Sequence, residues 1–431
     1  MRTPAPGHGA TLQTWLAHLE ISHAKAIDLG LDRLRTVADK LELTCPFVVI
    51  TVGGTNGKGS TCAMLEAILL AAGYKTGLYT SPHLIDFNER IRVNGAAASD
   101  AQIVAQFERI DRARGEVTLS YFEYATLAAL LLFAEQRLDV AILEVGLGGR
   151  LDAVNVVDAD CAVITSVDID HVEYLGDDRE AIGWEKAHIF RPGRPAVCAD
   201  PEPPATVISH AKEIGADLWL FGRDFNYSGD RQQWAFAGRQ QRRSGLAYPA
   251  LRGANQLLNA SAALAALEAL RPRLAVPQQA VRIGLAQVVL PGRLQILPGE
   301  PTVVLDVAHN PHAASALALS LGGMAYYPYT HAVFGMMRDK DMRGVIEKLA
   351  RSVDHWHCAS LAGDRGADGA DLAALVADVA RDDAISISSY ENPTLAFAAA
   401  RNQAGKDDRI LVFGSFATVG PVLAELGRKA S

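Results

Sequence analysis

The 431-residue sequence contains only five cysteines, and no two of them form a C-x-x-C pair. Their odd number and wide scatter argue against a disulfide framework or a cysteine zinc site and indicate a reducing compartment. The first ten residues, MRTPAPGHGA, lack the apolar core of a signal peptide. The apolar run 126–134 is too short to cross a bilayer. We therefore expect a cytoplasmic protein with no membrane segment.

An excess of positive charge is also missing. The chain has 41 Lys and Arg against 49 Asp and Glu, which gives a formal net charge of −8. Because nucleic-acid binding needs clustered Lys and Arg against phosphates, this balance disfavours nucleic acid as the main partner. One basic cluster, RQQRR at 239–243, is interpreted as a solvated loop.

Hydrophobic residues make up 49% of the chain and charged residues 21%, which is typical of a globular protein with a large core. Strand-like and helix-like segments alternate in the first part of the chain, and this alternation predicts a parallel sheet covered by helices. Strands are expected at 47–52, 76–80, 139–145, 161–167 and 196–199, and helices at 61–72, 122–136, 181–190 and 255–270.

A second alternating series follows a Pro- and Gly-rich segment at 291–301, which we interpret as a linker and hinge. Before it, the polar and aromatic residues 232–249 predict a small antiparallel excursion. The second series has strands at 302–307, 331–335, 352–357, 384–387 and 409–413, and helices at 311–321, 342–351, 371–381, 393–403 and 417–426. We expect two α/β domains, residues 1–296 and 297–431, with a cleft between them.

The segment GGTNGKGS at 53–60 lies between a predicted strand and a predicted helix. A glycine loop in that place lets backbone N–H groups approach phosphate oxygens, and Lys58 and the helix N-terminus add positive charge. The common pattern G-x-x-x-x-G-K-[ST] is not met, because Val52 replaces its first glycine and Gly59 separates Lys58 from Ser60. The segment therefore predicts a nucleotide-phosphate site of an uncommon form.

Polar residues follow three other predicted strands: Ser81, Glu144 and the segment DIDH at 168–171. The carboxyl ends of parallel strands meet at one edge of a sheet, where ligands bind. Glu144 ends an apolar run, and a buried carboxylate there is costly unless it is paired or bound to a metal. Taken alone, Ser81 can be a turn residue and His171 a loop histidine. The glycines after Glu144 can make a simple turn or allow close approach to a ligand.

Together these segments resemble the folylpolyglutamate synthase/dihydrofolate synthase family, which belongs with the Mur ligases to one group of ATP-dependent ligases. The motifs, in chain order, are GGTNGKGS, TSPHL with NERI, LEVGLGGRLDAVN, SVDIDH, GWEKAHIFRPG, LPGRLQI and LDVAHNPHA. The resemblance implies an N-terminal P-loop Mur ligase-like parallel-sheet domain and a smaller C-terminal Rossmann-like α/β domain. T-N-G-K-G-S is the form of the phosphate loop that this family uses.

Position by position, the resemblance implies a nucleotide site and a metal site. The residues implied to bind ATP are Thr55, Asn56, Gly57, Lys58, Gly59, Ser60, Asn255, Arg293 and Asp306. The implied Mg²⁺ ligands are Ser81, Glu144, His171 and Lys186, the last as a carbamate that helps to hold a second Mg²⁺. Catalytic roles are implied for Lys58, Lys186 and His171. Without the resemblance, Lys186 reads as a surface lysine paired with Glu185 or Asp178.

The resemblance also implies a substrate site. Its residues are Ile27, Asp28, Leu29, Tyr121, Phe122, Glu123, Leu151, Asp152, Ala153 and His309. Without the resemblance, Asp28 and Glu123 read as helix-start residues. One departure from the family is His188, where E-K-A-G-I usually has Gly, so the surroundings of Lys186 could differ.

The implied activity is ATP-dependent ligation of L-glutamate to 7,8-dihydropteroate, and to the γ-carboxylate of tetrahydrofolates, through an acyl phosphate. The implied protein is a monomer. One alternative is a Mur-type amino acid ligase, disfavoured because the phosphate loop begins at Gly53 and leaves little chain for a further N-terminal domain. A nucleotide-binding regulatory protein without ligation is disfavoured by the complete set of Lys58, Ser81, Glu144, His171 and Lys186.

Overall fold

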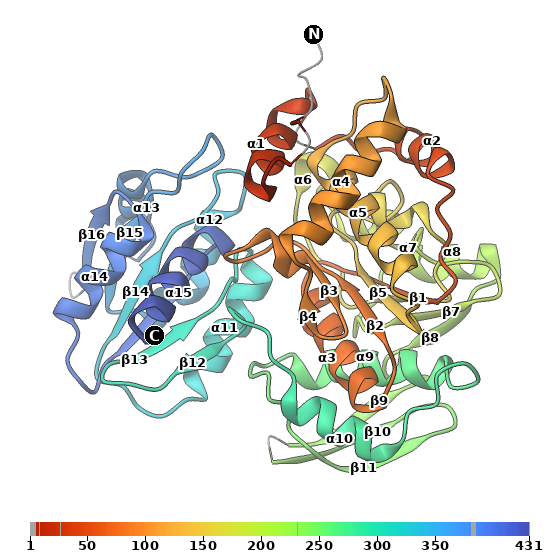
Figure 1. The fold of residues 1–431 in the computed structure, drawn as a ribbon. Coiled ribbons are helices and arrows are strands. Elements are labelled where there is room, and N and C mark those ends of the chain that lie inside the picture. Colours follow the sequence, from red (N-terminus) through yellow and green to blue (C-terminus); the bar gives the residue numbers. More distant parts are fainter. Residues whose placement is uncertain (1–5, 8, 26, 231, 381–384, 431) are drawn as a thin grey trace. The chain divides into compact units, whose positions relative to one another are not determined.

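The computed structural model describes residues 6–7, 9–25, 27–230, 232–380 and 385–430 (Figure 1). The chain divides into two compact units. The first contains Met1–Pro82, Phe87–Ala250 and Leu257–Val288, and the second contains His83–Asp86, Leu251–Gln256 and Val289–Ser431. The domain bounds expected from the sequence, residues 1–296 and 297–431, stay a prediction.

The first unit is built on an eight-stranded sheet in the order β4-β3-β2-β5-β1-β6-β7-β8. The strands from β2 to β8 in this order are parallel, as expected, while β3 and β4 form an antiparallel edge beside β2. The bounds are β1 (Val48–Gly53), β2 (Thr76–Tyr79), β3 (Ile91–Val93), β4 (Ala96–Ala97), β5 (Val140–Glu144), β6 (Cys161–Ile164), β7 (Pro195–Cys198) and β8 (Asp217–Leu220).

Helices cover this sheet, and α5 is buried over nearly its whole length because its residues are apolar on all sides. None of the helices in the part of the chain described is long and apolar enough to cross a membrane. The helices of this unit are α1 (Leu12–Ser22), α2 (Asp32–Lys40), η1 (Phe87–Arg90), α4 (Asp100–Arg114), α5 (Tyr121–Glu135), η2 (Ala153–Val156), α6 (Val172–Leu175), α7 (Arg179–Ala187), α8 (Ala205–Ile214), α9 (Gln256–Ala269), α10 (Gln278–Gln287) and α3 (Lys58–Ala71).

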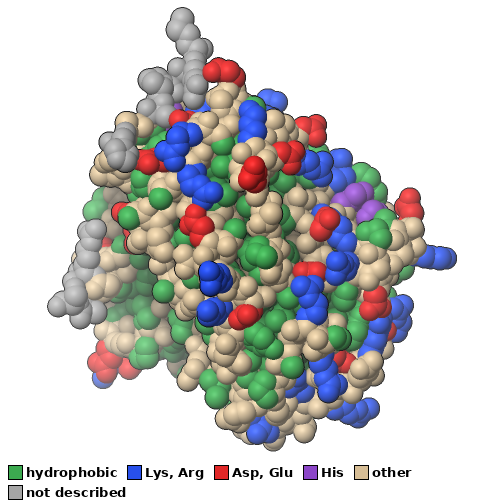
Figure 2. Space-filling model, turned by 45° about the vertical axis from the view of Figure 1, so that its right-hand side comes forward, with side chains coloured by type: hydrophobic (Ala, Val, Ile, Leu, Met, Phe, Trp, Pro, Cys, Tyr) green, Lys and Arg blue, Asp and Glu red, His purple; other side chains and the backbone are tan. Residues whose placement is uncertain are grey.

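The expected antiparallel excursion is a three-stranded sheet of β9 (Asn226–Gly229), β10 (Gln233–Ala237) and β11 (Arg242–Ala247). The solvated-loop interpretation of RQQRR is wrong for Arg243, which β11 turns inward and which donates to Val276 O at 2.9 Å. Arg239 pairs with Asp217. Figure 2 shows Lys and Arg side chains interspersed with Asp and Glu on the face that it draws.

The second unit has a six-stranded sheet in the order β12-β13-β17-β14-β15-β16, parallel except for β12. The expected linker at 291–301 is therefore partly wrong, since it contains β12, which pairs with β13. The strands are β12 (Gln295–Leu297), β13 (Thr302–Leu305), β14 (Thr330–Phe334), β15 (His355–Ala359), β16 (Ser386–Tyr390) and β17 (Arg409–Phe413). The helices are α11 (Pro311–Gly322), α12 (Met342–Leu349), η3 (Ala350–Ser352), α13 (Gly369–Ala380), α14 (Pro393–Gln403) and α15 (Phe416–Ala430).

Apolar cores lie on both faces of this second sheet. Two expected element ends, Arg381 and Ala384, lie outside the described residues. The mixed α/β class with a parallel sheet in each unit is confirmed.

Candidate active site

The glycine loop joins β1 to α3 and needs glycine at two positions. Gly54 has a φ of +140° and Gly57 a φ of +88°, and L side chains rarely adopt either. A Cβ at Gly54 would collide with Thr165 Oγ1, and one at Gly57 would collide with Asn259 Oδ1. The backbone of the loop is therefore packed against β6 and α9 with no room for side chains at these points.

Side chains beyond β6 hold the loop in place. Thr55 N donates to Ser166 O at 2.8 Å, and Asn56 N donates to Ser166 Oγ at 3.1 Å. Thr165 Oγ1 donates to Asn56 O at 2.6 Å, and Thr55 Oγ1 donates to Asp168 O at 3.0 Å. These four hydrogen bonds hold the loop against the segment that follows β6. Sequence reasoning missed Thr165, Ser166 and Asn259 as supports of the loop. Ser166 opens the motif SVDIDH, whereas Thr165 lies inside the expected strand 161–167 and Asn259 carries no signal.

Lys58 places its charge over the mouth of the loop. Its Nζ donates to Gly54 O at 2.9 Å and to Thr55 O at 3.1 Å. Lys58 is also the first residue of α3, and no side chain caps this helix N-terminus. The ammonium group and the helix dipole therefore both favour an anion at the loop, as phosphate binding requires.

The ends of β2 and β5 bring Ser81 and Glu144 together. Glu144 ends β5, is 4% exposed and accepts a hydrogen bond at its Oε2 from Ser81 N at 3.3 Å. The neighbouring strand β1 places Val52 opposite Glu144, so this carboxylate lies at the same edge of the sheet as the glycine loop. A buried carboxylate beside a phosphate loop is a suitable ligand for a magnesium nucleotide.

His171 directly precedes α6 and has a φ of +54°, and its N–H donates to Asp170 Oδ1 at 2.8 Å. Across the described residues, no group of three or more His, Cys, Asp or Glu side chains is arranged to hold a metal ion. That result fits Mg²⁺, which commonly takes one or two protein carboxylates and fills its shell with water and substrate phosphates. The structure thus brings Ser81 and Glu144 together. The role of His171 as a metal ligand stays a prediction.

Lys186 lies on α7 and is 4% exposed. Burial, and to a smaller extent the charge of Lys58, lower its pKa to about 7, while Asp170 and Asp152 oppose the shift. The alternative of a surface lysine is therefore wrong. Its two expected partners are also engaged elsewhere, since Glu185 pairs with Arg150 at 2.9 Å and Asp178 caps the start of α7.

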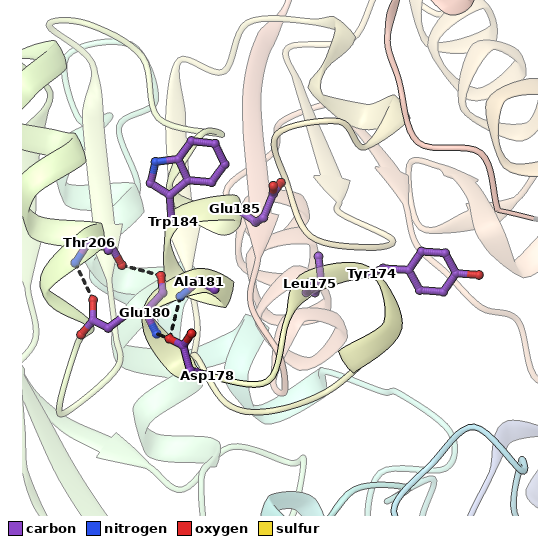
Figure 3. A pocket seen from close by; sticks show the side chains of 8 residues that line it. All are labelled: Tyr174, Leu175, Asp178, Glu180, Ala181, Trp184, Glu185 and Thr206. Atoms are coloured by element: carbon purple, nitrogen blue, oxygen red, sulfur yellow. Dashed lines mark hydrogen bonds between the residues drawn. The ribbon is translucent and has the colours of Figure 1, made fainter.

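Figure 3 shows this first turn of α7, beside a surface pocket of about 340 Å³. The Asp178 carboxylate accepts hydrogen bonds from the backbone N–H groups of Glu180 and Ala181 at 2.7 and 3.0 Å. The Glu180 carboxylate in turn accepts one from Thr206 N at 2.8 Å. The acidic side chains at this end of the pocket therefore fix α7 and α8 rather than approach Lys186.

The glycines after Glu144 allow close packing against α7. A Cβ at Gly149 would lie 2.8 Å from Glu185 O and 3.1 Å from Lys186 Cα. His188, at the end of α7, has an ordinary φ of −71°, so this position does not need the glycine usual in the family. Its ring lies against His210 with centroids 4.0 Å apart. Histidine in place of the usual glycine at position 188 therefore does not disturb the end of α7.

Three segments expected on the pterin side converge in the first unit. Gly30 N donates to Leu151 O at 3.3 Å, and Arg33 pairs with both Asp28 and Glu123, at 2.7 and 3.2 Å. The helix-start interpretation is confirmed for Glu123, which forms a capping box with Ser120. It is wrong for Asp28, because α2 begins at Asp32.

Asp152 belongs to the third of these segments and is buried. Its carboxylate accepts hydrogen bonds from Leu147 N at 2.8 Å and Val154 N at 3.0 Å. Burial nevertheless raises its pKa to about 6. The remaining expected substrate residues of this unit lie on three segments. Tyr121 and Phe122 begin α5, Leu151 precedes η2 and Ala153 begins it, and Ile27 and Leu29 lie before α2.

In the second unit, Asp306 follows β13 and organises a loop. Its two carboxylate oxygens accept hydrogen bonds from Leu294 N at 2.7 Å and Ala308 N at 2.8 Å. Burial raises its pKa, and the nearby charge of Arg293 opposes this shift. His309 lies on the same loop, with its Nδ1 2.9 Å from Val307 O. Asn255, the other expected nucleotide residue of this unit, directly precedes α9.

Comparison with known proteins identifies the family. The Mur ligase middle domain matches residues 52–267, and the Mur ligase, glutamate ligase domain matches residues 292–416. The dihydrofolate synthase/folylpolyglutamate synthase of Escherichia coli is 45% identical over 99% of this chain and 98% of its own length. The chain belongs to the dihydrofolate synthase/folylpolyglutamate synthase family. The enzyme of that name from Bacillus subtilis is 33% identical over 87% of this chain and 89% of its own length.

Solved structures of this ligase family agree with the fold. E. coli FolC in complex with DHPP and ADP superposes with a TM-score of 0.94 at 45% identity, with all of both chains covered. A bifunctional folylpolyglutamate synthase/dihydrofolate synthase with Mn, AMPPNP and L-glutamate bound gives a TM-score of 0.91 at 42% identity, covering 98% of this chain and 100% of that one. The predicted family and its two-part α/β architecture are confirmed, and the protein is a ligase of this family.

Proposed function

We propose that the protein uses ATP to join L-glutamate to 7,8-dihydropteroate and to the γ-carboxylate of tetrahydrofolates. The observation that carries this proposal is the edge of the first sheet, where the rigid phosphate loop lies beside the buried Glu144. Such an edge suits phosphoryl transfer, because catalysis of that step rests on positioning and charge. The ligands in the related structures support the choice of nucleotide, pterin and glutamate.

The reaction proceeds in two steps. A carboxylate oxygen of the pteroate attacks the γ-phosphorus of ATP, which breaks the bond to ADP and forms an acyl phosphate. The amine of glutamate then attacks the acyl carbon, loses a proton and expels inorganic phosphate, which keeps the attacking carboxylate oxygen. The loop amides and Lys58 would offset the negative charge that spreads over the transferred phosphoryl group.

Mg²⁺ fits the first of these steps. The donor set of Ser81, Glu144 and His171 offers one buried carboxylate, a hydroxyl and an imidazole, and leaves positions for water and phosphate. When bound, the ion would supply positive charge to the β- and γ-phosphate oxygens. We assign these three residues to the first Mg²⁺.

We further propose that Lys186 is carbamylated and helps to hold a second Mg²⁺. Only a neutral amine attacks carbon dioxide, and burial together with Lys58 makes the neutral form of Lys186 accessible near pH 7. The carbamate would replace a buried cation by an anion close to Lys58, which removes the repulsion between the two lysines. It would also provide oxygen ligands of the kind that Mg²⁺ prefers.

The remaining expected residues receive roles on the same basis. Asn255, Arg293 and Asp306 of the second unit are assigned to the nucleotide, and His309 to a substrate. The converging segments 27–29, 121–123 and 151–153 are assigned to the pterin. We also propose that the protein is a monomer. We propose the cytoplasm as its location because all five cysteines are free and four of them are buried.

Purified protein with Mg-ATP and labelled L-glutamate, offered either 7,8-dihydropteroate or tetrahydrofolate, tests the proposal. We expect a labelled, chromatographically distinct product with each acceptor and none when ATP is omitted. The Lys58→Ala variant should remain folded and give no product. A wild-type protein that ligates glutamate to neither acceptor would refute the proposed function.

A further inference from the structure

The described residues of the segment between α1 and α2, 23–25 and 27–31, form few hydrogen bonds to the rest of the first unit. Residues 27–31 form neither helix nor strand, and Gly30 N donates a long hydrogen bond of 3.3 Å to Leu151 O. Its other fastening converges on the Asp28 carboxylate, which accepts from His23 Nε2 at 3.0 Å and from Arg33 Nη1 at 2.7 Å. The position of this segment therefore depends on side chains rather than on a helix or sheet.

Arg33 connects this segment to α5. Its Nη2 donates to Asp28 O at 3.0 Å and to Glu123 Oε1 at 3.2 Å, while Nη1 pairs with the Asp28 carboxylate. One planar guanidinium thus bridges the segment and the first turn of α5. The fork geometry of arginine suits such a bridge, since its donors point to two acceptors at once.

Glu123 is a well-supported anchor for this bridge. Its side chain is 3% exposed, and its Oε2 accepts a hydrogen bond from Ser120 N at 2.7 Å. Among the described residues, Arg33 is the one cation within ion-pair distance of Glu123. Burying a carboxylate without a charged partner destabilises the fold. The ion pair with Glu123 therefore fixes the position of the Arg33 guanidinium, which in turn holds the segment.

The bridge joins two of the three segments assigned to the pterin. The first turn of α5 carries Phe122, whose ring packs against Tyr79 with centroids 5.9 Å apart. We infer that Arg33 is a positioning residue that fastens residues 27–29 against the start of α5 and thereby sets the affinity for the pterin substrate. This inference rests on the proposed function.

Steady-state kinetics of the Arg33→Ala variant test the inference. Loss of the bridge should raise KM for 7,8-dihydropteroate by about ten-fold or more and leave KM for Mg-ATP within about two-fold, since a charge-assisted bond is worth at least a ten-fold change. Arg33→Lys should be intermediate, because an ammonium cannot reach both carboxylates in one plane. Arg35→Ala, an exposed position on the same helix, is the matched control and should match the wild type.

A second variant separates the bridge from a general loss of structure. Glu123→Gln keeps the capping box with Ser120 but removes the charge that Arg33 contacts. We compare the double variant Arg33→Ala/Glu123→Gln with Arg33→Ala alone. If the bridge sets the affinity for dihydropteroate, the double variant has a KM for dihydropteroate no higher than that of Arg33→Ala, because both changes break the same interaction. Additive increases in KM would contradict the inference, as would an unchanged KM in Arg33→Ala. Wild-type protein that makes no product from dihydropteroate would instead refute the proposed use of this substrate and leave the role of Arg33 aside.

Discussion

Replacing Lys186 by methionine should stabilise the fold while it abolishes ligation. The buried amine has a folded pKa of about 7 against an ordinary value of 10.5, so below pH 10.5 the folded state binds fewer protons than the unfolded state. Stability is therefore lost as the pH falls from 10.5 towards 7. At pH 7.5 this cost reaches up to ~4 kcal/mol. Because methionine also loses the attraction of Asp170 and Asp152, we expect a gain of about 2 kcal/mol in bicarbonate-free buffer.

The same shift predicts carbamate formation at neutral pH. With a pKa of about 7, roughly three quarters of the Lys186 side chains are neutral at pH 7.5, against about 0.1% for an ordinary lysine. Bicarbonate should therefore raise the turnover of protein prepared without it. In ¹³C-labelled bicarbonate the wild type should show one carbamate signal by NMR under native conditions, and Lys186→Met should not.

Chemical denaturation and turnover of the wild type and of Lys186→Met, measured side by side, test both the cost of the buried amine and the catalytic role of Lys186. Lys212→Met, at an exposed position on α8, is the matched control and should change neither stability nor activity. If Lys186→Met is less stable than the wild type in bicarbonate-free buffer, the cost assigned to the buried amine is wrong. Full turnover in that variant would refute the catalytic role of Lys186.

Three further perturbations test other parts of the structure. Gly57→Ala should raise the dissociation constant of Mg-ATP by about ten-fold or more, because of its positive φ and the collision with Asn259, whereas Gly73→Ala, with the same φ of +88° and open space, should not. Glu144→Gln should raise the Mg²⁺ concentration for half-maximal turnover by about ten-fold, and an identical Mg²⁺ titration would exclude it as a ligand. Burial lowers the pKa of His357 to about 4, so stability should fall by about 2–3 kcal/mol between pH 7.5 and 4.5. In denaturant titrations His357→Leu should flatten this decline, and an equally steep decline would count against the assignment.

Elements with strong local signals could be predicted closely. Helix α14 occupies the expected residues 393–403, because Asn392 caps it and Pro393 opens it. Strand β17 likewise occupies 409–413, where RILVF is buried throughout. Strand β12 could not be predicted, because three residues within a Pro- and Gly-rich segment become a strand only through pairing with β13.

Site residues that belong to a sequence motif could be predicted, whereas residues that reach the site only through the packing of helices could not. The glycine loop and Glu144 stand out in the sequence, and the structure places both at one sheet edge. The burial of Lys186 depends on how α7 packs, and no local pattern shows it. Asn259 contacts the glycine loop from a helix about 200 residues further along the chain, so only the folded structure reveals it.

The central claim is ligation through an acyl phosphate, and oxygen transfer tests it most directly. 7,8-Dihydropteroate labelled with ¹⁸O in its carboxylate is converted with Mg-ATP and L-glutamate, and the inorganic phosphate is analysed by mass spectrometry. The account predicts that each phosphate released carries one oxygen from the pteroate carboxylate. Phosphate without ¹⁸O, formed together with the ligated product, would contradict it.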